Sequence, residues 1–349
     1  MKKIVSIIAV LAVAVGMTAC GNNTDNKIEV TEAAESISET AVEEKTETTA
    51  ETIAEEKLLN AQLEKDGYIY DEYETYIEIT KYTGDATEVV IPSEIDGKAV
   101  ASIGKDTFLS GSYIKSIEIP SSVTSIGEMA FYCCVSLENI KIPDSVTTIS
   151  GGAFMGCSSL ESIELPDNIN SIDYGTFSYC LSLKNIKIPE NVTEIGENAF
   201  YNCTSLESIE ISDSVISIGE TAFEKCENLK NIDFSENLES IGEMAFHGCT
   251  NLESIELPES LITINKGAFY ECKSLKNVKI PVNIKYIGEY AFSYCENLKS
   301  VEIPDVNFKI EDWAFADCVS LEEVKIPDYI IREEIFNDTP FLENYLAKE

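Results

Sequence analysis

Histidine and tryptophan each occur once in this chain of 349 residues, and basic residues are scarce. Nucleophilic triads and histidine-ligated metals need histidine with defined neighbours, so a single His247 nearly excludes both. Lysine and arginine number 25 against 62 aspartates and glutamates, which gives a formal net charge of -37. No basic stripe is present to neutralise phosphates, so nucleic acid and anionic lipid are disfavoured as partners. The acidity itself is explained by solubility and by repulsion between neighbouring molecules.

Long apolar runs are also scarce, and the run at the N-terminus is short. The positive start Met1-Lys2-Lys3 precedes an apolar run over residues 4–15, which is too short to span a bilayer as a stable helix. The run ends in Met17-Thr18-Ala19-Cys20-Gly21, with small residues just before a cysteine. This stretch resembles the lipobox of bacterial lipoproteins, although Met17 stands where leucine is usual. The resemblance implies a signal peptide over residues 1–19 and lipidation of Cys20 as the anchor.

Aromatic residues are nearly absent from the next segment, which is rich in threonine, alanine and glutamate. Such a segment cannot bury enough apolar surface to offset its ordering entropy. We expect residues 20–65 to form a lipid-anchored, acidic, low-complexity tether. Within it, residues 53–65 have a helix-forming composition that predicts a frayed helix. Residues 21–65 hold twelve acids and four lysines, so most of the negative charge lies from Asp66 onward.

The cysteines reveal the organisation of the rest of the chain, because nine of them recur at intervals of 23 residues. A phenylalanine precedes each of them by three residues, and Phe108 extends this series by one unit. We predict that these two residue types form a structural spine: Phe131, Cys134, Phe154, Cys157, Phe177, Cys180, Phe200, Cys203, Phe223, Cys226, Phe246, Cys249, Phe269, Cys272, Phe292, Cys295, Phe315 and Cys318.

Each unit predicts a short strand followed by a helical turn. Leu183, Ile186 and Ile188 have the spacing of a strand with alternate side chains turned inward, and Pro189 ends the pairing because it lacks an N–H. Identical strands every 23 residues must stack in parallel. The Gly-x-x-Ala-Phe-x-x-Cys segment opens in most units with a residue favoured at a helix N-cap. Its inward alanine, phenylalanine and cysteine would then stack from unit to unit as a continuous apolar column.

This unit resembles the BspA-like class of leucine-rich repeats over about residues 67–349. The resemblance implies an α/β repeat fold: a leucine-rich-repeat solenoid of about ten 23-residue coils, with a parallel β-sheet on one face and short helical turns on the other. It assigns an N-terminal cap and first irregular repeat to residues 66–112, the solenoid to residues 113–327 and a C-terminal cap to residues 328–349.

A row of nine thiols raises the question of metal or redox chemistry. Stacked coils would place one sulfur per coil, about 4.8 Å from the next, and such a row neither converges on a metal nor reaches the dihedral of a disulfide. We therefore expect buried, reduced, structural cysteines, no metal and no cofactor. Cys133 is the exception, because it lies beside Cys134 where the helical turn should face outward. We expect its side chain to be exposed.

The outward positions of the strands alternate between acid and lysine along most of the stack. In a parallel stack each lysine has carboxylates on the neighbouring strands, which fixes the register. The alternation fails at Glu210, Asp233 and Glu256, three acids in successive coils. This acidic run is a candidate for binding a basic protein segment or a calcium ion. Carboxylates roughly 5 Å apart also occur in retaining glycosidases, but an open sheet face offers no pocket that excludes water.

Aromatic residues gather in outward positions of the C-terminal coils: Tyr270, Tyr286, Tyr290, Tyr294 and Trp313. Tyr290 and Trp313 occupy the same position in adjacent coils, so their rings should touch. Exposed tyrosine and tryptophan are enriched at recognition surfaces and stack well on sugars. These five residues are a second candidate binding surface, with chance clustering as the alternative.

The sequence thus favours a protein that binds and does not catalyse. Its resemblance implies an exported cell-surface binding or adhesion protein, anchored to the envelope by its N-terminal lipid alone, with a host or microbial surface protein or glycan as partner. One alternative is an envelope lipoprotein that captures polysaccharide, and a second is a carboxylate-based hydrolase. A purely structural role is a further alternative.

Overall fold

The computed structural model describes residues 57–327 and 330–347, and Leu58–Glu349 form one compact unit. The signal peptide over residues 1–19, the anchor Cys20 and residues 20–56 of the tether lie outside the described residues. Among the described residues, no helix has the length and apolarity that crossing a membrane requires.

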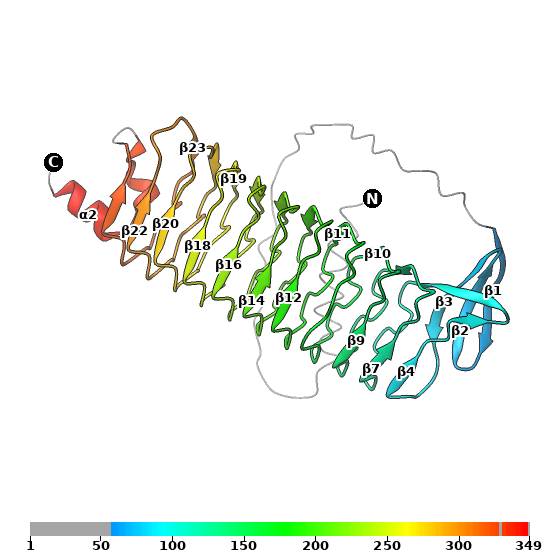
Figure 1. The fold of residues 1–349 in the computed structure, drawn as a ribbon. Coiled ribbons are helices and arrows are strands. Elements are labelled where there is room, and N and C mark those ends of the chain that lie inside the picture. The colour runs from blue at the N-terminus through cyan, green and yellow to red at the C-terminus, as the bar shows by residue number, and fades with distance from the viewer. Residues whose placement is uncertain (1–56, 328–329, 348–349) are drawn as a thin grey trace, which may run out of the picture. The chain divides into compact units, whose positions relative to one another are not determined.

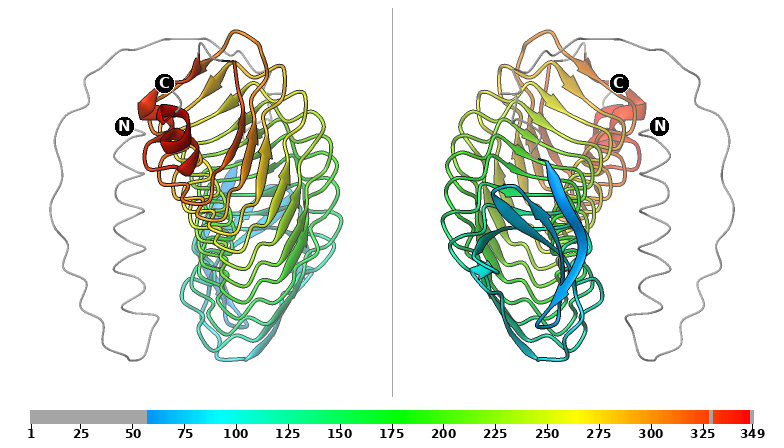
Figure 2. Two further views of the ribbon diagram at one scale, coloured as in Figure 1. Left: turned by 90° about the vertical axis from the view of Figure 1, so that its left-hand side faces the viewer. Right: turned by 90° about the vertical axis from the view of Figure 1, so that its right-hand side faces the viewer.

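The compact unit is a solenoid of about eleven coils of 23 residues, with two columns of short parallel strands (Figures 1 and 2). The first column holds β4 (Glu88–Val90), β7 (Ser116–Glu118), β9 (Asn139–Lys141), β12 (Asn185–Lys187), β14 (Ser208–Glu210), β16 (Asn231–Asp233), β18 (Ser254–Glu256), β20 (Asn277–Lys279), β22 (Ser300–Glu302) and β24 (Glu323–Lys325). The second holds β8 (Ser125–Ile126), β10 (Thr148–Ile149), β11 (Ser171–Ile172), β13 (Glu194–Ile195), β15 (Ser217–Ile218), β17 (Ser240–Ile241), β19 (Thr263–Ile264), β21 (Tyr286–Ile287) and β23 (Lys309–Ile310).

Pairing runs from coil to coil in both columns. The first column forms the sheets β4-β7-β9, β12-β14-β16-β18 and β20-β22-β24, and an isolated bridge joins Ser162, in the coil between β9 and β12, to Asn185 of β12. In the second column, β11-β13-β15-β17-β19-β21-β23 form one sheet, and β8 and β10 belong to the sheet of the N-terminal cap. The inward residue is an isoleucine or valine in both columns: it is the middle residue of each three-residue strand in the first column and the second residue of each two-residue strand in the second. The leucine-rich-repeat solenoid is therefore confirmed.

The third side of each coil consists of turns, so the short helical turns expected there are wrong. Backbone N–H groups in this segment alternate between two kinds of acceptor. The Phe131 N–H donates to the Ala153 carbonyl of the next coil at 2.8 Å, whereas the Cys134 N–H donates to the Phe131 carbonyl at 3.1 Å. A helix would keep all these bonds inside one coil. The stack instead uses half of them to join neighbouring coils.

The predicted spine is confirmed, because every phenylalanine ring in it is buried and lies parallel to the next. The centroids of adjacent rings in the column from Phe108 to Phe336 lie 5.1–5.6 Å apart. Each spine thiol donates a hydrogen bond to the backbone carbonyl of the phenylalanine in the preceding coil, as Cys157 does to Phe131 at 3.3 Å. The nine thiols are buried and none of them forms a disulfide bond, which agrees with a structural role.

Cys133 is also buried, with 4% of its surface exposed, so the expected exposed side chain is wrong. Its backbone is left-handed, at φ 55°, which turns the side chain toward the next coil. That coil carries Gly156, and a Cβ there would lie 3.1 Å from the Cys133 sulfur. The missing side chain of Gly156 is what makes room for the thiol.

The N-terminal cap contains β1 (Leu58–Lys65), β2 (Tyr68–Tyr73), β3 (Tyr76–Tyr82), β5 (Glu94–Ile95) and β6 (Lys98–Ile103). Strand β1 pairs antiparallel with β2, so the frayed helix expected up to residue 65 is wrong and the last part of the expected tether belongs to the cap. Sheet pairing and the packing of Leu63 against the core override the helical propensity of this segment.

The C-terminal cap contains the 3₁₀ helix η2 (Glu333–Phe336) and the helix α2 (Pro340–Leu346). The Phe336 ring covers the end of the phenylalanine column, 5.6 Å from Phe315. Thr339 caps α2, because its hydroxyl accepts the Leu342 N–H at 3.2 Å. The apolar column thus ends against a protein cover and not against water.

Candidate ligand-binding surfaces

The acidic run has the register that the repeat predicts. Glu210 pairs with Asp233 and Asp233 pairs with Glu256 across adjacent strands of the first column. All three side chains are exposed. Among the described residues, no group of three histidine, cysteine, aspartate or glutamate side chains is placed to hold a metal ion, so the geometry gives no support to calcium binding here.

The pairing of serine with asparagine that accompanies the acid–lysine alternation on this face escaped the sequence analysis. Strands alternate between Ser-Ile-Glu and Asn-Ile-Lys or close variants, and Asp233 stands where the pattern places a lysine. The serine hydroxyl donates to the asparagine of the preceding coil, for example from Ser208 to Asn185 at 2.6 Å and from Ser300 to Asn277 at 2.7 Å. Comparing alternate coils in place of adjacent ones would have revealed this pattern.

Charged side chains one position before the strands also form ion pairs, between a glutamate of one coil and a lysine of the next. Lys184 lies 2.8 Å from Glu161, and Lys230 lies 3.8 Å from Glu207. Exposed pairs of this kind stabilise a fold by about 0–1 kcal/mol each. An open groove of about 480 Å³ runs beside Ile163, Lys187 and Glu210 where the first column is interrupted. Lysines one position before the strands are thus paired with carboxylates of the preceding coil, whereas the acidic run places three carboxylates side by side.

The turn face brings together four of the five predicted aromatic residues. Tyr290 and Trp313 stack with centroids 5.3 Å apart and an interplanar angle of 8°, so the predicted contact is confirmed. Tyr270 meets Tyr294 edge to face at 5.4 Å and Tyr290 at 6.5 Å. We refer to Tyr270, Tyr290, Tyr294 and Trp313 as the aromatic cluster. Tyr286 lies outside it, on β21, where the Lys309 ammonium sits 5.8 Å from its ring centroid.

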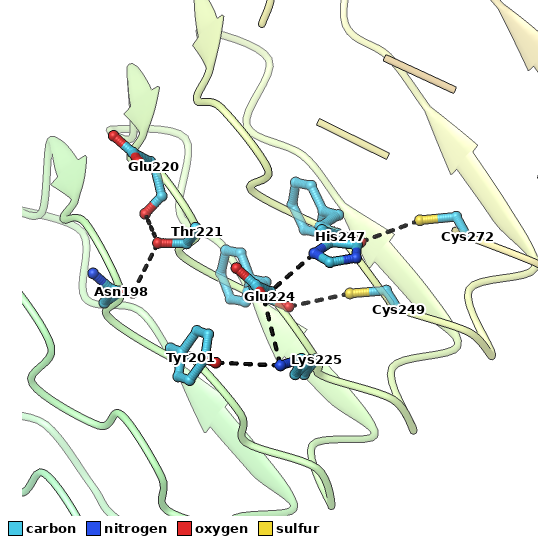
Figure 3. A network of polar contacts seen from close by, with 11 residues as sticks. Asn198, Tyr201, Glu220, Thr221, Glu224, Lys225, His247, Cys249 and Cys272 are labelled. Carbon is cyan, nitrogen blue, oxygen red and sulfur yellow. Dashed lines mark hydrogen bonds and ion pairs between the residues drawn. The ribbon is translucent and has the colours of Figure 1, made fainter. Parts of the chain in front are cut away.

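His247 adjoins the aromatic cluster and links it to a polar network, a contact that the sequence analysis missed. Its ring centroid lies 5.2 Å from that of Tyr270, and its Nδ1 lies 3.3 Å from the Glu224 carboxylate. Figure 3 shows Glu224 between His247 and Lys225, with Lys225 also bonded to the Tyr201 hydroxyl at 3.3 Å. The signal for this contact was the shared position of residues 247 and 270, one period of 23 apart.

Three members of the aromatic cluster have a backbone conformation that favours glycine. Tyr290, Tyr294 and Trp313 have φ of 58°, 58° and 59°. Two such left-handed positions recur in each coil, five residues and one residue before the cysteine, and in other coils they carry varied residues, such as Gly248 and Lys225. A left-handed residue with a side chain costs about 1–2 kcal/mol. The rings are therefore held outward at a local cost in stability.

Carboxylates surround the exposed edge of the aromatic cluster. Asp317 raises the pKa of the Tyr294 phenol through its negative charge and a hydrogen bond, and Asp338 and Glu271 add to this effect. Burial and the charge of Asp338 raise the pKa of Asp317 in turn. The Trp313 N–H donates to the Glu334 carbonyl at 2.8 Å, which ties this coil to the C-terminal cap. A negative potential thus converges on exposed aromatic rings.

The buried thiols are unsuited to redox or nucleophilic chemistry. Burial raises the pKa of Cys203 from 9.0 to about 12 and moves the pKa of Cys226 and Cys272 well above the usual range. A thiol must ionise to attack a substrate or bind a metal. These groups instead act as hydrogen-bond donors inside the core.

Comparison with known proteins agrees with this architecture. The family model described as a BspA type leucine rich repeat region matches residues 101–230 and 216–343, in six copies. This chain belongs to the BspA-type leucine-rich-repeat family. A leucine-rich repeat protein from Bacteroides ovatus ATCC 8483 is 32% identical over 80% of each chain, with a TM-score of 0.72.

A second similar structure is that of the T. pallidum leucine rich repeat protein TpLRR. It is 34% identical, covers 55% of this chain and 90% of its own, and has a TM-score of 0.51. The comparison with curated proteins gave no match.

Proposed function

We propose that this BspA-type protein is a non-catalytic cell-surface protein that uses its solenoid to bind a macromolecular partner, either a protein or a glycan. The observation that carries the proposal is the aromatic cluster, in which Trp313 stacks on Tyr290 at 5.3 Å while Trp313 and Tyr294 stay exposed. Exposed tyrosine and tryptophan side chains are enriched at recognition surfaces. Membership of the family supports a scaffold that displays side chains on a regular stack.

Catalysis has less support than binding. The exposed carboxylates of the acidic run lie on an open strand face, and His247 contacts a carboxylate with no nucleophile joined to the pair in the network of Figure 3. General acid–base catalysis needs groups that converge on a bound substrate. Capture of polysaccharide is the second candidate function, because exposed tyrosine and tryptophan rings also stack on sugars.

Attachment to the membrane is proposed to depend on Cys20 alone. Changing Cys20→Ser removes the sulfur that would carry the lipid, so we expect the protein to move from the membrane fraction to the soluble fraction. Fractionation of the producing bacteria followed by immunoblotting measures this shift. A variant that stays in the membrane fraction would show that another part of the protein anchors it.

Binding is proposed to require the stacked pair in the aromatic cluster. With Trp313→Ala and Tyr290→Ala combined, we expect retention of the purified protein on immobilised host-matrix or microbial-surface extracts to fall at least tenfold, as it does when hot-spot residues are truncated. Surface plasmon resonance at two salt concentrations measures retention.

The matched control combines Leu181→Ala with Ile262→Ala, two residues as exposed as Trp313, at 37% and 38%. This control should bind like the unmodified protein, and circular dichroism should show both variants folded. Unchanged retention by the aromatic variant would remove the aromatic cluster from the proposal. No saturable binding to any extract would remove the proposed function itself.

A further inference from the structure

The solenoid twice combines an ammonium group, a tyrosine ring and a carboxylate. The Lys225 ammonium lies 5.6 Å from the Tyr201 ring centroid and 3.8 Å from the Glu224 carboxylate. The Lys309 ammonium lies 5.8 Å from the Tyr286 ring centroid and is paired with Glu311. A cation over a tyrosine face gains from the ring quadrupole, and an adjacent carboxylate adds charge attraction.

The aromatic cluster has the tyrosine ring and the carboxylate of this combination, but the lysines near it are paired with other carboxylates. Asp317 occupies the position of Tyr294 in the next coil, where the Tyr294 backbone N–H donates to the Ala316 carbonyl at 3.0 Å, and among the described residues Asp317 forms no ion pair. The nearby lysines are engaged elsewhere. Lys273 bonds to Glu296 at 3.0 Å, and Lys266 bonds to Glu289 at 3.0 Å. The negative potential at Tyr294 is therefore balanced less well than at Tyr201 or Tyr286.

Exposure and charge identify what this surface can accept. Tyr294 and Trp313 expose 41% and 37% of their surface, so a ligand can reach both rings. Asp317, Asp338 and Glu271 act on Tyr294, and the chain as a whole carries a formal charge of -37. These features complement a positive group and repel an anionic one.

We infer that the aromatic cluster and Asp317 bind an arginine or lysine side chain of a partner polypeptide. This inference rests on the proposed binding function and specifies its chemistry. A guanidinium group can lie flat on a tyrosine or tryptophan ring while its N–H groups bond to the Asp317 carboxylate. A neutral sugar can also stack on the rings, but it gains nothing from the net negative charge beside them.

Trp313 provides the measurement, because it is the only tryptophan in the chain. The probe is a tetra-arginine peptide with blocked ends, titrated into the purified protein at low salt. We expect a saturable change in tryptophan fluorescence, and we expect added salt to weaken the apparent affinity. Blocked tetra-glutamate and a neutral oligosaccharide such as cellohexaose should leave the fluorescence unchanged.

Asp317→Asn is the decisive variant, because asparagine tolerates the left-handed backbone at this position, where φ is 57°. We expect this change to weaken binding of the arginine peptide about fivefold, the scale of one exposed charge-assisted contact. The control is Asp213→Asn, which removes an equal charge from an exposed turn in another coil. It should weaken binding less than twofold, which separates a site from general attraction to an acidic protein.

Several results would overturn the inference. Equal weakening by Asp317→Asn and Asp213→Asn would mean that only overall charge attracts the peptide. A fluorescence response to cellohexaose and not to the arginine peptide would assign the aromatic cluster to glycan. The arginine peptide could fail to bind while the double variant Trp313→Ala and Tyr290→Ala still loses retention on the extracts. That result would support the proposed binding function and would show that its ligand is not a cationic side chain.

Discussion

Raising the pH above about 9 is expected to destabilise the solenoid steeply, because its buried thiols resist ionisation while the folded state lasts. Burial raises the pKa of Cys203 from 9.0 to about 12. The same cause moves the pKa of six further spine thiols well above the usual range: Cys157, Cys180, Cys226, Cys249, Cys272 and Cys295. The thiol hydrogen bonds to the phenylalanine carbonyls require the protonated form.

The direction follows from proton binding in the two states. Below pH 9 the thiol is protonated in both the folded and the unfolded chain, so its full contribution to stability is present. Between pH 9 and about 12 the unfolded chain releases the Cys203 proton and the folded chain keeps it, so the free energy of unfolding falls as pH rises. Each pH unit costs about 1.4 kcal/mol for each such thiol. Several thiols together would exceed the roughly 5–15 kcal/mol that stabilises a typical domain.

Urea unfolding followed by circular dichroism at a series of pH values, under reducing conditions, measures this effect. Cys203→Ser is the control, because a serine hydroxyl can donate the same hydrogen bond to Phe177 and does not titrate in this range. Its free energy of unfolding should fall less steeply with pH than that of the unmodified protein, by about 1.4 kcal/mol per pH unit. Parallel curves for the two proteins would mean that Cys203 does not govern the loss.

The features that depend on the 23-residue period could be predicted from the sequence. A residue repeated at one position of every coil has one environment, so the dry column of Phe223 and Cys226 and the register of Glu210 with Asp233 followed from spacing alone. The contact between Tyr290 and Trp313 followed for the same reason. Periodicity fixes which residues are neighbours between coils, and these contacts are of that kind.

The conformation within a coil could not be predicted in the same way. Propensity for an N-cap and a helix describes a segment by itself, whereas the turn face gives half of its N–H groups to the next coil. That pattern of hydrogen bonds accompanies the left-handed residues, the burial of Cys133 and the contacts of Tyr290 and Tyr294 with Tyr270. Tyr286 was grouped with them by sequence distance, but it lies on a strand of another side of the coil. The side of a coil on which a residue lies depends on the tertiary fold and not on its distance along the sequence.

The same division applies to the two candidate binding surfaces, the acidic run and the aromatic cluster. Contacts between residues at one position of the repeat could be predicted, and other contacts could not. The charge of Asp233 is visible in the sequence, but the sequence does not show which charged residues beside the strands form ion pairs, as Lys184 does with Glu161. The contacts of the Tyr270 ring with Tyr290 and Tyr294 are diagonal, because these residues do not share one position in the coil. Diagonal contacts depend on side-chain direction, which a repeat period leaves undefined.

Phe223→Ala is expected to lower the free energy of unfolding by about 3–5 kcal/mol, the usual cost of emptying a buried phenylalanine site. The ring is fully buried and lies 5.1 Å from both Phe200 and Phe246, so its loss leaves a cavity between two rings. The backbone bond from the Phe223 N–H to the Ala245 carbonyl keeps the coils in register, and this limits collapse of the cavity.

The position of Phe223 adds a second consequence. Each coil contacts only its neighbours, so a weakened interface in the middle of the stack lowers the coupling between the two halves. Trp313 reports on the C-terminal half and circular dichroism on the whole chain. The two urea transitions should coincide in the unmodified protein and separate in Phe223→Ala. Ile216→Ala, in the same coil but 44% exposed, should change the free energy by less than about 0.5 kcal/mol. Equal effects of the two substitutions would mean that stacked phenylalanines are not what holds the coils together.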